Sequence, residues 1–244
     1  MISPTHDTTG RQILETIAKA DRFNSWLFSN VQPYLNGSIL EIGSGIGNIS
    51  EHILNQHSET SLSDTDPEYV RLLEQRFERH PQLKGIFQID LENSPLNQGL
   101  ANLEGAFDTV ISINVLEHIE NDSQAIEYMK FFLKPGGTLI ILTPAYPSLL
   151  SKLDKALGHF RRYSHKKISD LVKKQGMSIR RLFHFNSIGV IAWTYGKVLN
   201  LRTIPKQEMK LFNKLVPIGK FFDRMLFQKA GLSIIIIAEK STLN

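Results

Sequence analysis

Short apolar runs alternate with helical segments through the middle of the chain, and this alternation limits the fold more than any other feature. The apolar runs end at turns rich in Gly, Pro or Asp; they cover residues 38–42, 60–63, 85–89, 107–113, 138–143, 178–184 and 231–239. Helical segments fall between them, for example at 47–56, 67–79, 123–133 and 166–175. Strands that alternate with helices favour a parallel sheet with helices packed on its faces. The sequence therefore predicts an α/β fold.

Two segments lie outside this alternation, within what we interpret as a single domain over residues 1–244. Residues 1–34 are expected to form an N-terminal helical cap, in which Phe23 or Trp26 either contacts a bound ligand or packs the cap onto the sheet. Residues 186–230 are expected to form a helical insertion, or lid, which Pro217 would divide into two helices. Apolar side chains recur there at helical spacing, and we expect this stripe to cover the core: Leu211, Leu215, Ile218, Phe222 and Met225.

The absence of cysteine excludes several kinds of site, and the lack of long apolar runs bears on where the protein is found. A chain of 244 residues with no Cys can form no disulfide, no Cys-ligated zinc or iron–sulfur site and no Cys nucleophile. The first residues carry no apolar signal segment, and the longest apolar run, 234–238, is far too short to cross a bilayer. We therefore expect a cytoplasmic protein.

Charge is divided unevenly along the chain. Residues 1–150 hold 9 Lys and Arg against 19 Asp and Glu, a net of −10, whereas residues 151–244 hold 19 against 5, a net of +14. Within 202–229, seven basic residues oppose Glu208 and Asp223, and large apolar residues stand between them. A solvated basic face would explain this pattern, but a basic amphipathic helix also suits an anionic membrane, so we expect peripheral membrane contact through 202–229. No nucleic-acid module is recognisable, and we expect no nucleic-acid partner.

The strongest local motif is a glycine-rich turn between a predicted strand and a predicted helix, Glu41-Ile-Gly43-Ser-Gly45-Ile-Gly47. Glycines let the backbone turn tightly and approach a ligand, and the helix N-terminus offers free N–H groups. The spacing differs from the G-x-G-x-x-G of dinucleotide sites, and the Glu41 carboxylate would repel a pyrophosphate but attract an ammonium. Asp64, 21 residues after Gly43, can accept hydrogen bonds from both hydroxyls of a ribose, whereas Asp66 suits the N-cap of the next helix.

Four further motifs follow this turn: Ser63-Asp-Thr-Asp-Pro-Glu, Ile89-Asp-Leu, the strand and turn over 107–119, and the Lys-Pro-Gly-Gly strand over 133–144. In this order and spacing, the chain resembles a class I S-adenosylmethionine (SAM)-dependent methyltransferase of the small-molecule type, near the ubiquinone and menaquinone methyltransferases. The resemblance implies a Rossmann-like seven-stranded sheet with helices on both faces. Six strands would be parallel and the last, 231–239, antiparallel. It also implies SAM as the cofactor.

The resemblance assigns cofactor contacts residue by residue. The glycine-rich turn would line the methionine part of SAM, the acid after the second strand would hold the ribose, and the motif after the third strand would contact the adenine. The residues are Glu41, Gly43, Gly45 and Asn114 at the methionine part, Asp64 at the ribose, and Asp90 and Leu91 at the adenine. The Lys134-Pro-Gly-Gly segment is expected to be a structural turn before the fifth strand.

Two histidines are the main candidates for removing a proton from an acceptor, because imidazole titrates near neutrality. His118 follows the fourth strand, and it either acts as a base or only packs beneath the cofactor. Glu117 beside it would allow a metal site, as in quinone O-methyltransferases thought to depend on metals. Two adjacent ligands are few, however, and we expect no metal.

The second histidine, His159, lies in a loop after the fifth predicted strand that also holds Arg161, Arg162 and Tyr163. The two Arg and Tyr163 could orient an anionic or phenolic acceptor, and Tyr163 is also a candidate for catalysis. The alternative is a basic loop that only leads into a helix capped by Ser164.

We therefore expect SAM-dependent methyl transfer to a small-molecule, lipid-linked or glycan-type acceptor by direct in-line displacement, with oxygen or nitrogen as the attacking atom. Enzymes that methylate the amino group of adenine resemble one another in carrying an N/D-P-P-Y/F turn after the fourth strand. This chain has Asn114-Val-Leu-Glu there, so we do not expect it to methylate adenine. Two other functions stay open. One is an NAD-dependent oxidoreductase on a similar fold, and the other is a SAM-binding subunit without activity.

Overall fold

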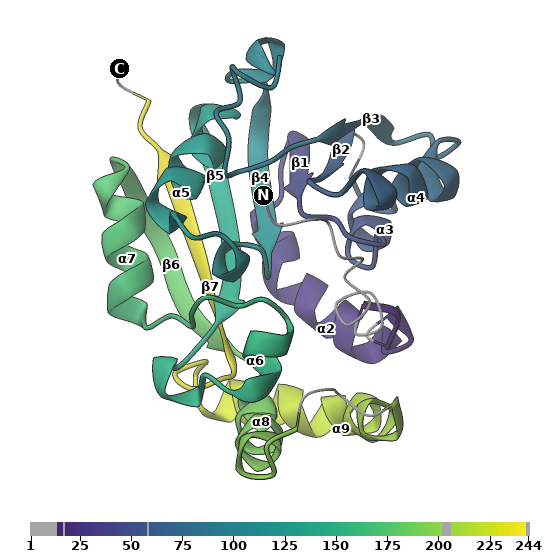
Figure 1. Ribbon diagram of the computed structural model, residues 1–244, viewed down its shortest axis with the longest axis vertical. Helices are drawn as coiled ribbons and strands as arrows, with labels where there is room; N and C mark the ends of the chain where they lie inside the picture. Colours follow the sequence, from purple (N-terminus) through teal and green to yellow (C-terminus); the bar gives the residue numbers. More distant parts are fainter. Residues whose placement is uncertain (1–13, 17, 58, 202–205, 243–244) are drawn as a thin grey trace.

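The computed structural model describes residues 14–16, 18–57, 59–201 and 206–242, and no side chains for 206–208. Over these residues the chain forms one seven-stranded sheet with helices packed around it (Figure 1). The strands are β1 (Ser38–Ile42), β2 (Glu59–Asp64), β3 (Leu83–Gln88), β4 (Phe107–Ile113), β5 (Leu133–Pro144), β6 (Met177–Phe185) and β7 (Ser233–Lys240).

The strand order is β3-β2-β1-β4-β5-β7-β6. The pairs β1–β2, β2–β3, β1–β4 and β4–β5 are parallel, whereas β7 runs antiparallel to both β5 and β6. The predicted Rossmann-like sheet with an antiparallel last strand is confirmed. Because the strand order reverses between β1 and β4, the loops after these strands diverge and leave a crevice at the carboxyl edge of the sheet. This is where open α/β sheets bind ligands.

Helices cover both faces of the sheet, because successive residues of a strand point to opposite sides. In β7, Ile234 and Ile236 belong to one hydrophobic cluster, and Ile235 and Ile237 belong to another. Helices α5 (Asp122–Phe131) and α7 (His165–Lys174) pack into the first cluster. Helices α2 (Asp21–Val31) and α9 (Lys206–Met225) pack into the second. The predicted two-faced arrangement is therefore confirmed.

Side-chain caps set the start of several helices. Asp66 accepts a hydrogen bond from the Glu68 backbone N–H at 2.7 Å and begins α4 (Pro67–Phe77), as predicted. Ser164 caps α7 in the same way through the Lys167 N–H. The helix after the glycine-rich turn, α3 (Ser50–Leu54), is shorter than the predicted 47–56, because residues 45–49 form turns.

The Lys134-Pro-Gly-Gly segment lies inside β5, and its prediction as a turn before that strand was wrong. Leu133 pairs with Phe107, and pairing resumes between Thr138 and Thr109, so the segment forms a bulge within the ladder. The Lys134 ammonium lies 2.8 Å from the Asp108 carboxylate and ties the bulge to β4. Because of the bulge, the strand can contain a proline and two glycines and still pair with β4 on both sides of them.

The described residues between β6 and β7 form two helices, α8 (Ser187–Val198) and α9, but Pro217 is not the point that separates them. It lies inside α9, where packing outweighs the one backbone hydrogen bond that a proline removes. Val216 is buried, and Gly219 allows α9 to approach the Trp26 ring of α2. Trp26 is therefore a core residue that packs the cap onto the sheet, whereas Phe23 lines the cavity described below. Of the predicted N-terminal cap, residues 1–13 and 17 lie outside the described residues.

The predicted inward apolar stripe of the insertion was also wrong. Its members are all exposed to solvent: Leu211, Leu215, Ile218, Phe222 and Met225. The face of α9 that packs inward instead carries Met209, Val216 and Gly219. Both faces of this helix hold apolar residues, so periodicity alone predicts the helix but does not identify its buried side.

Candidate active site

A cavity of about 760 Å³ lies at the carboxyl edge of the sheet. Its wall is formed by the segments after β1, β2, β3 and β4, the loop after β5, and residues of α2, α8 and α9. All seven residues predicted to hold the cofactor line it: Glu41, Gly43, Gly45, Asp64, Asp90, Leu91 and Asn114. Of the residues predicted on the acceptor side, His118, His159 and Arg162 line the same cavity.

Backbone hydrogen bonds hold the glycine-rich turn in a conformation that favours glycine at positions 43 and 45. The N–H groups of Gly43 and Ser44 donate to the Ser63 carbonyl at 2.9 and 2.8 Å. Gly43 has φ +77°, and a Cβ atom there would lie 2.2 Å from a methyl carbon of Val115. Gly45, at φ +55°, donates its N–H to the Asp64 carboxylate at 2.8 Å. The turn therefore presents bare backbone to the cavity and fixes the position of Asp64.

Glu41 and Asp64 place two buried carboxyl groups beside this turn. Glu41 accepts hydrogen bonds from the hydroxyls of Ser44, at 2.9 Å, and Ser50. Burial raises the pKa of Glu41 to about 7, and the negative charge of Asp64 adds to the shift. Asp64 also accepts the Asp66 N–H at 3.1 Å, and burial raises its pKa. A cation arriving in the cavity would favour the ionised form of both groups.

The wall continues at the end of β3 with Asp90 and Leu91. The Asp90 carboxylate accepts hydrogen bonds from the Glu92 N–H at 2.8 Å and the Asn93 side chain at 2.7 Å. Leu91 is buried beside it. On the other side of the crevice, Asn114 has φ +54° and donates its N–H to the Leu142 carbonyl. This left-handed residue ends β4 and turns the chain towards Glu117 and His118.

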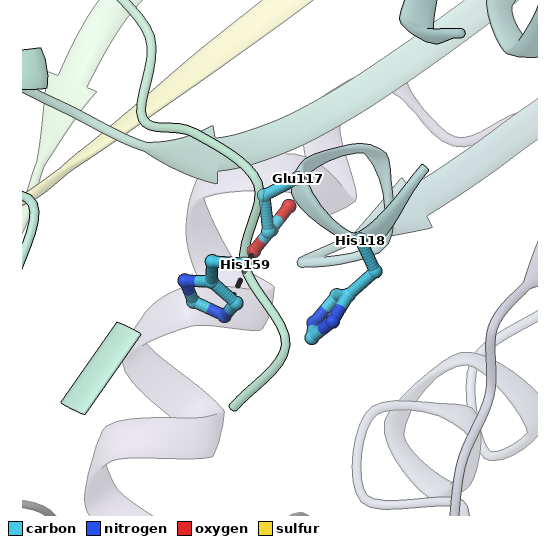
Figure 2. A group of neighbouring side chains, drawn as sticks. All are labelled: Glu117, His118 and His159. Atoms are coloured by element: carbon cyan, nitrogen blue, oxygen red, sulfur yellow. Dashed lines mark ion pairs between the residues drawn. The ribbon is translucent and has the colours of Figure 1, made fainter. Parts of the chain in front are cut away.

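Glu117, His118 and His159 form a second group in the cavity wall, shown in Figure 2. Glu117 and His118 end a 3₁₀ helix, Leu116–His118, after β4, and His159 comes from the loop after α6 (Lys152–Ala156). The Glu117 Oε1 atom lies 4.0 Å from His159 Nε2, and the two imidazole rings lie edge to face at 4.7 Å. One ligand atom from each residue lies within 4.8 Å of the others, so the group could surround one metal ion.

Burial sets the protonation of Glu117 and His118. Glu117 is fully buried, and neither of its carboxyl oxygens has a hydrogen-bond partner in another described residue. Burial raises the pKa of Glu117 to about 8, so the side chain is neutral at neutral pH. Burial and the neighbouring His159 lower the pKa of His118 to about 4, so its ring is also neutral there. This part of the cavity wall thus holds two side chains, Glu117 and His118, that are neutral at neutral pH.

His159 is held from behind by a buried carboxylate. Its Nδ1 atom lies 2.9 Å from Asp154 Oδ1, and the same oxygen accepts a hydrogen bond from Arg162 at 2.8 Å. Burial raises the pKa of Asp154, but hydrogen bonds from His159, Arg162 and Ser151 outweigh burial and keep that pKa below its usual value. Because an ionised Asp154 can only accept, Nδ1 of His159 carries a hydrogen, so in the neutral ring the lone pair is on Nε2.

Two predicted acceptor-side residues have structural positions instead. Tyr163 is fully buried, does not line the cavity, and donates its hydroxyl to the Leu116 carbonyl at 3.2 Å. Arg161 bonds the Ile119 and Glu120 carbonyls and pairs with Asp122 at 3.0 Å. Both side chains fasten the loop after α6 to the segment after β4. We therefore remove Tyr163 from both the catalytic and the acceptor-binding candidates, and Arg161 from the acceptor-binding ones.

A family model described as a methyltransferase domain matches residues 40–139, from β1 into β5. The chain contains a class I, SAM-dependent methyltransferase domain. Its curated relatives include hybrid PKS-NRPS synthetases of Fusarium sp. (34% identical over 113 residues) and Talaromyces variabilis (31% over 132 residues). These matches cover 45% and 51% of this chain, and 3% of the length of each relative.

Solved structures share the fold of the methyltransferase domain at low identity. A SAM-dependent methyltransferase from Archaeoglobus fulgidus has a TM-score of 0.55 at 16% identity, over 89% of this chain and 94% of its own. Phosphoethanolamine N-methyltransferase 2 of Haemonchus contortus, solved with SAM, has a TM-score of 0.59 at 16% identity. The match covers 90% of this chain and 53% of that one. The CurJ carbon methyltransferase has a TM-score of 0.58 at 15% identity, and the match covers 91% of this chain and 54% of that one. Nothing in these likenesses distinguishes the ubiquinone and menaquinone group, which stays a prediction.

The cavity of the methyltransferase domain fits SAM by the chemistry of its wall. SAM presents an ammonium, a ribose diol and an adenine, and the wall offers the Glu41 carboxyl, the Asp64 carboxylate and the Asp90–Leu91 pair at successive strand ends. The raised pKa of Glu41 indicates a buried carboxyl group that a cation would stabilise. These residues, with Gly43, Gly45 and Asn114, are those that would hold the cofactor.

Sequence reasoning missed part of the acceptor side of the methyltransferase domain. Asp154 orients His159, and Trp193 of α8 lines the cavity with its ring 4.3 Å from the Arg162 guanidinium. A signal for Asp154 was present, because Ser151-Lys-Leu-Asp154 is a capping box, which marks a helix start after β5. No pattern in the sequence pointed to Trp193.

Proposed function

We propose that the protein transfers the methyl group of SAM to an acceptor that first loses a proton to His159. The observation that carries this proposal is the Asp154–His159 pair, which shares one cavity with the glycine-rich turn and Asp64. Bound SAM supplies a methyl group activated by a positively charged sulfonium. The residues of this chain hold the cofactor, orient the acceptor and remove its proton.

His159 has the arrangement of a general base. The ionised Asp154 accepts from Nδ1–H, so it fixes the ring orientation and stabilises the imidazolium that forms when Nε2 takes a proton. Arg162 balances the Asp154 charge behind the ring. The neutral Glu117 lies 4.0 Å from His159 Nε2, and its buried carboxyl oxygens have no hydrogen-bond partner among the described residues.

The acceptor class that this site supports is a small molecule or lipid-linked molecule with an acidic O–H group, in line with the expected oxygen or nitrogen acceptor. The side of the cavity near α8 and α9 offers Trp193, Met209 and Phe212, which suit an apolar acceptor. Arg162 is occupied by Asp154 and Trp193, so we do not propose it as a free anion-binding group.

A second candidate is methylation of an acidic carbon. Solved structures with this fold include the CurJ carbon methyltransferase and a citrinin polyketide synthase CMeT domain, and the curated relatives are polyketide-type synthetases. A base such as His159 serves carbon and oxygen acceptors equally, because both must lose a proton before attack. Transfer of ¹³C-methyl from labelled SAM to a metabolite and lipid extract, read by NMR, separates O-methyl, N-methyl and C-methyl products by chemical shift.

The test of the proposal compares His159→Gln with His165→Gln, a matched change at a histidine outside the cavity wall. Loss of a positioned base slows turnover by roughly 10²- to 10⁴-fold, so His159→Gln should reduce S-adenosylhomocysteine release by that amount and leave SAM affinity unchanged. His165→Gln should retain both. An equal loss of SAM affinity in His159→Gln would assign the residue to the cofactor side instead.

The same assay tests the other functions. A wild-type protein that binds SAM in calorimetry but releases no S-adenosylhomocysteine with any acceptor pool would be a SAM-binding subunit. Binding of NAD in place of SAM would support an oxidoreductase.

Metal dependence has its own test. Glu117, His118 and His159 could surround an ion, but binding would have to ionise Glu117, whose pKa burial raises to about 8. We therefore expect dialysis against EDTA to leave turnover unchanged. Loss of turnover that Mg²⁺ or Zn²⁺ restores would show that these residues bind a metal.

A further inference from the structure

Helices α8 and α9 carry an unusual concentration of exposed apolar side chains. Of the fourteen large apolar side chains exposed among the described residues, twelve lie on these helices and the turns that follow them. We call this set the α8–α9 surface: Ile191, Tyr195, Val198, Leu199, Leu211, Leu215, Ile218, Phe221, Phe222, Met225, Leu226 and Phe227. Contiguous apolar patches on soluble domains usually mark a binding surface.

The core does not cover this surface, because other residues of the two helices already face inward. In α9, Asn213 accepts the Phe23 N–H at 3.1 Å, and Gly219 packs against Trp26. In α8, Trp193 and Gly196 face the cavity. Phe227 is 81% exposed and Ile191 is 75% exposed, so both side chains extend away from the fold.

Positive charge surrounds the exposed apolar side chains. Between Met209 and Lys229 the sequence holds five basic residues, all exposed: Lys210, Lys214, Lys220, Arg224 and Lys229. The one acid of this described stretch, Asp223, is buried and accepts hydrogen bonds from the N–H groups of Asn186 and Ser187 at the start of α8. Over Met209–Lys229 the exterior is therefore apolar and cationic, with no exposed carboxylate.

We propose that the α8–α9 surface binds the interface of a membrane that contains anionic lipids. Long Lys and Arg side chains reach lipid headgroups while aromatic and aliphatic side chains enter the acyl boundary, which is the arrangement of helices that lie in a membrane plane. Charge complementarity favours an anionic bilayer over a second copy of this chain, since two such basic surfaces would repel each other. No helix among the described residues is long and apolar enough to cross a membrane.

This binding mode would place the cavity next to the bilayer. Figure 1 shows α8 and α9 together at one end of the molecule, beyond the carboxyl edge of the sheet. The same helices line the cavity with Trp193, Gly196, Met209 and Phe212. A membrane-bound protein would thus receive an apolar acceptor from the side of the lipid. The membrane proposal itself does not depend on which reaction the site performs.

The test is co-sedimentation of the full chain with vesicles of phosphatidylglycerol and phosphatidylcholine in equal parts, and with vesicles of phosphatidylcholine alone, without SAM. We expect binding to the anionic vesicles that weakens as salt rises, because exposed charges are screened. Lys214→Glu with Lys220→Glu should weaken this binding roughly tenfold or more. Phe221→Ser with Phe227→Ser should also weaken it, through the apolar contribution.

The matched control is Lys173→Glu with Lys174→Glu, the same change of charge on exposed residues of α7. It should retain vesicle binding, and circular dichroism should show all variants folded. Equal binding to both vesicle types, equal loss in the control, or no binding at all would overturn the proposal. So would a dimer in solution that Phe221→Ser with Phe227→Ser dissociates, because the surface would then serve self-association.

Discussion

At the scale of single residues, Asp64 joins the structure of the site to its binding chemistry. Its carboxylate holds Gly45 and Asp66 through their N–H groups and still has lone pairs facing the cavity. We expect Asp64→Ala to weaken SAM binding about ten- to a hundredfold, since a hydrogen bond to a charged group contributes roughly 1.5–3 kcal/mol. Calorimetry measures this directly. Asp66→Asn keeps a capping side chain and should bind SAM normally; unchanged affinity in a folded Asp64→Ala would exclude the ribose role.

Gly45 gives a second prediction at this scale. Its φ of +55° disfavours any side chain, and a Cβ atom there would lie 3.2 Å from Leu14, another residue of the cavity wall. We expect Gly45→Val to abolish measurable SAM binding, because the branched side chain would distort the turn and enter the cavity. Gly99→Val, at a glycine with nothing within 4 Å of its Cβ position, is the control for backbone strain alone. Normal SAM affinity in Gly45→Val would contradict our interpretation of the turn.

At the scale of elements, the loop after α6 is fixed to the segment after β4 by Tyr163 and Arg161. Tyr163→Phe removes the hydroxyl that donates to Leu116 and leaves the ring in the core. We expect a loss of about 1 kcal/mol in the free energy of unfolding, with turnover close to that of the wild type. Urea denaturation and S-adenosylhomocysteine release measure the two. A large fall in turnover at unchanged stability would restore Tyr163 as a catalytic residue.

The elements also show how far sequence reasoning reaches. Strands and cofactor turns were predictable because local glycine, proline and acid patterns determine them, as at Gly43 and Asp66. Two features were not. The buried side of α9 depends on which of its two apolar faces meets Trp26, and the Asp154–His159 pair depends on a loop closing on itself. Such contacts between distant or irregular segments leave no periodic signal.

At the scale of the whole molecule, buried acids couple stability to pH. The pKa of Glu117 is raised to about 8 and that of Glu41 to about 7, both chiefly by burial. Between their ordinary values and these raised ones, the folded state binds more protons than the unfolded state, so stability falls as pH rises. Below about pH 6.5 the lowered pKa of His118 has the opposite effect on stability. The effect of the two acids is therefore best measured above about pH 6.5.

We expect the free energy of unfolding to decrease from pH 6.5 to 8.5, by at most about 1.4 kcal/mol per pH unit for each group. Glu117→Gln, which cannot ionise, should show a smaller decrease over this window. Urea denaturation at stepwise pH gives the slopes. Identical slopes in Glu117→Gln and wild type would mean that the Glu117 carboxyl does not titrate differently in the two states.

The pairing of β6 with β7 has a consequence for how this fold can change. Phe185 pairs with Ser233, and Leu232 donates its N–H to the Asn186 carbonyl, so the segment that holds α8 and α9 leaves and re-enters the sheet at one point. Lengthening a segment whose ends are already joined adds little chain entropy cost. We expect that such a segment can be replaced by one of different sequence or length, while the strands that position Gly43 and Asp64 stay intact. Acceptor choice could then diverge in evolution with no change in how the methyl donor is bound.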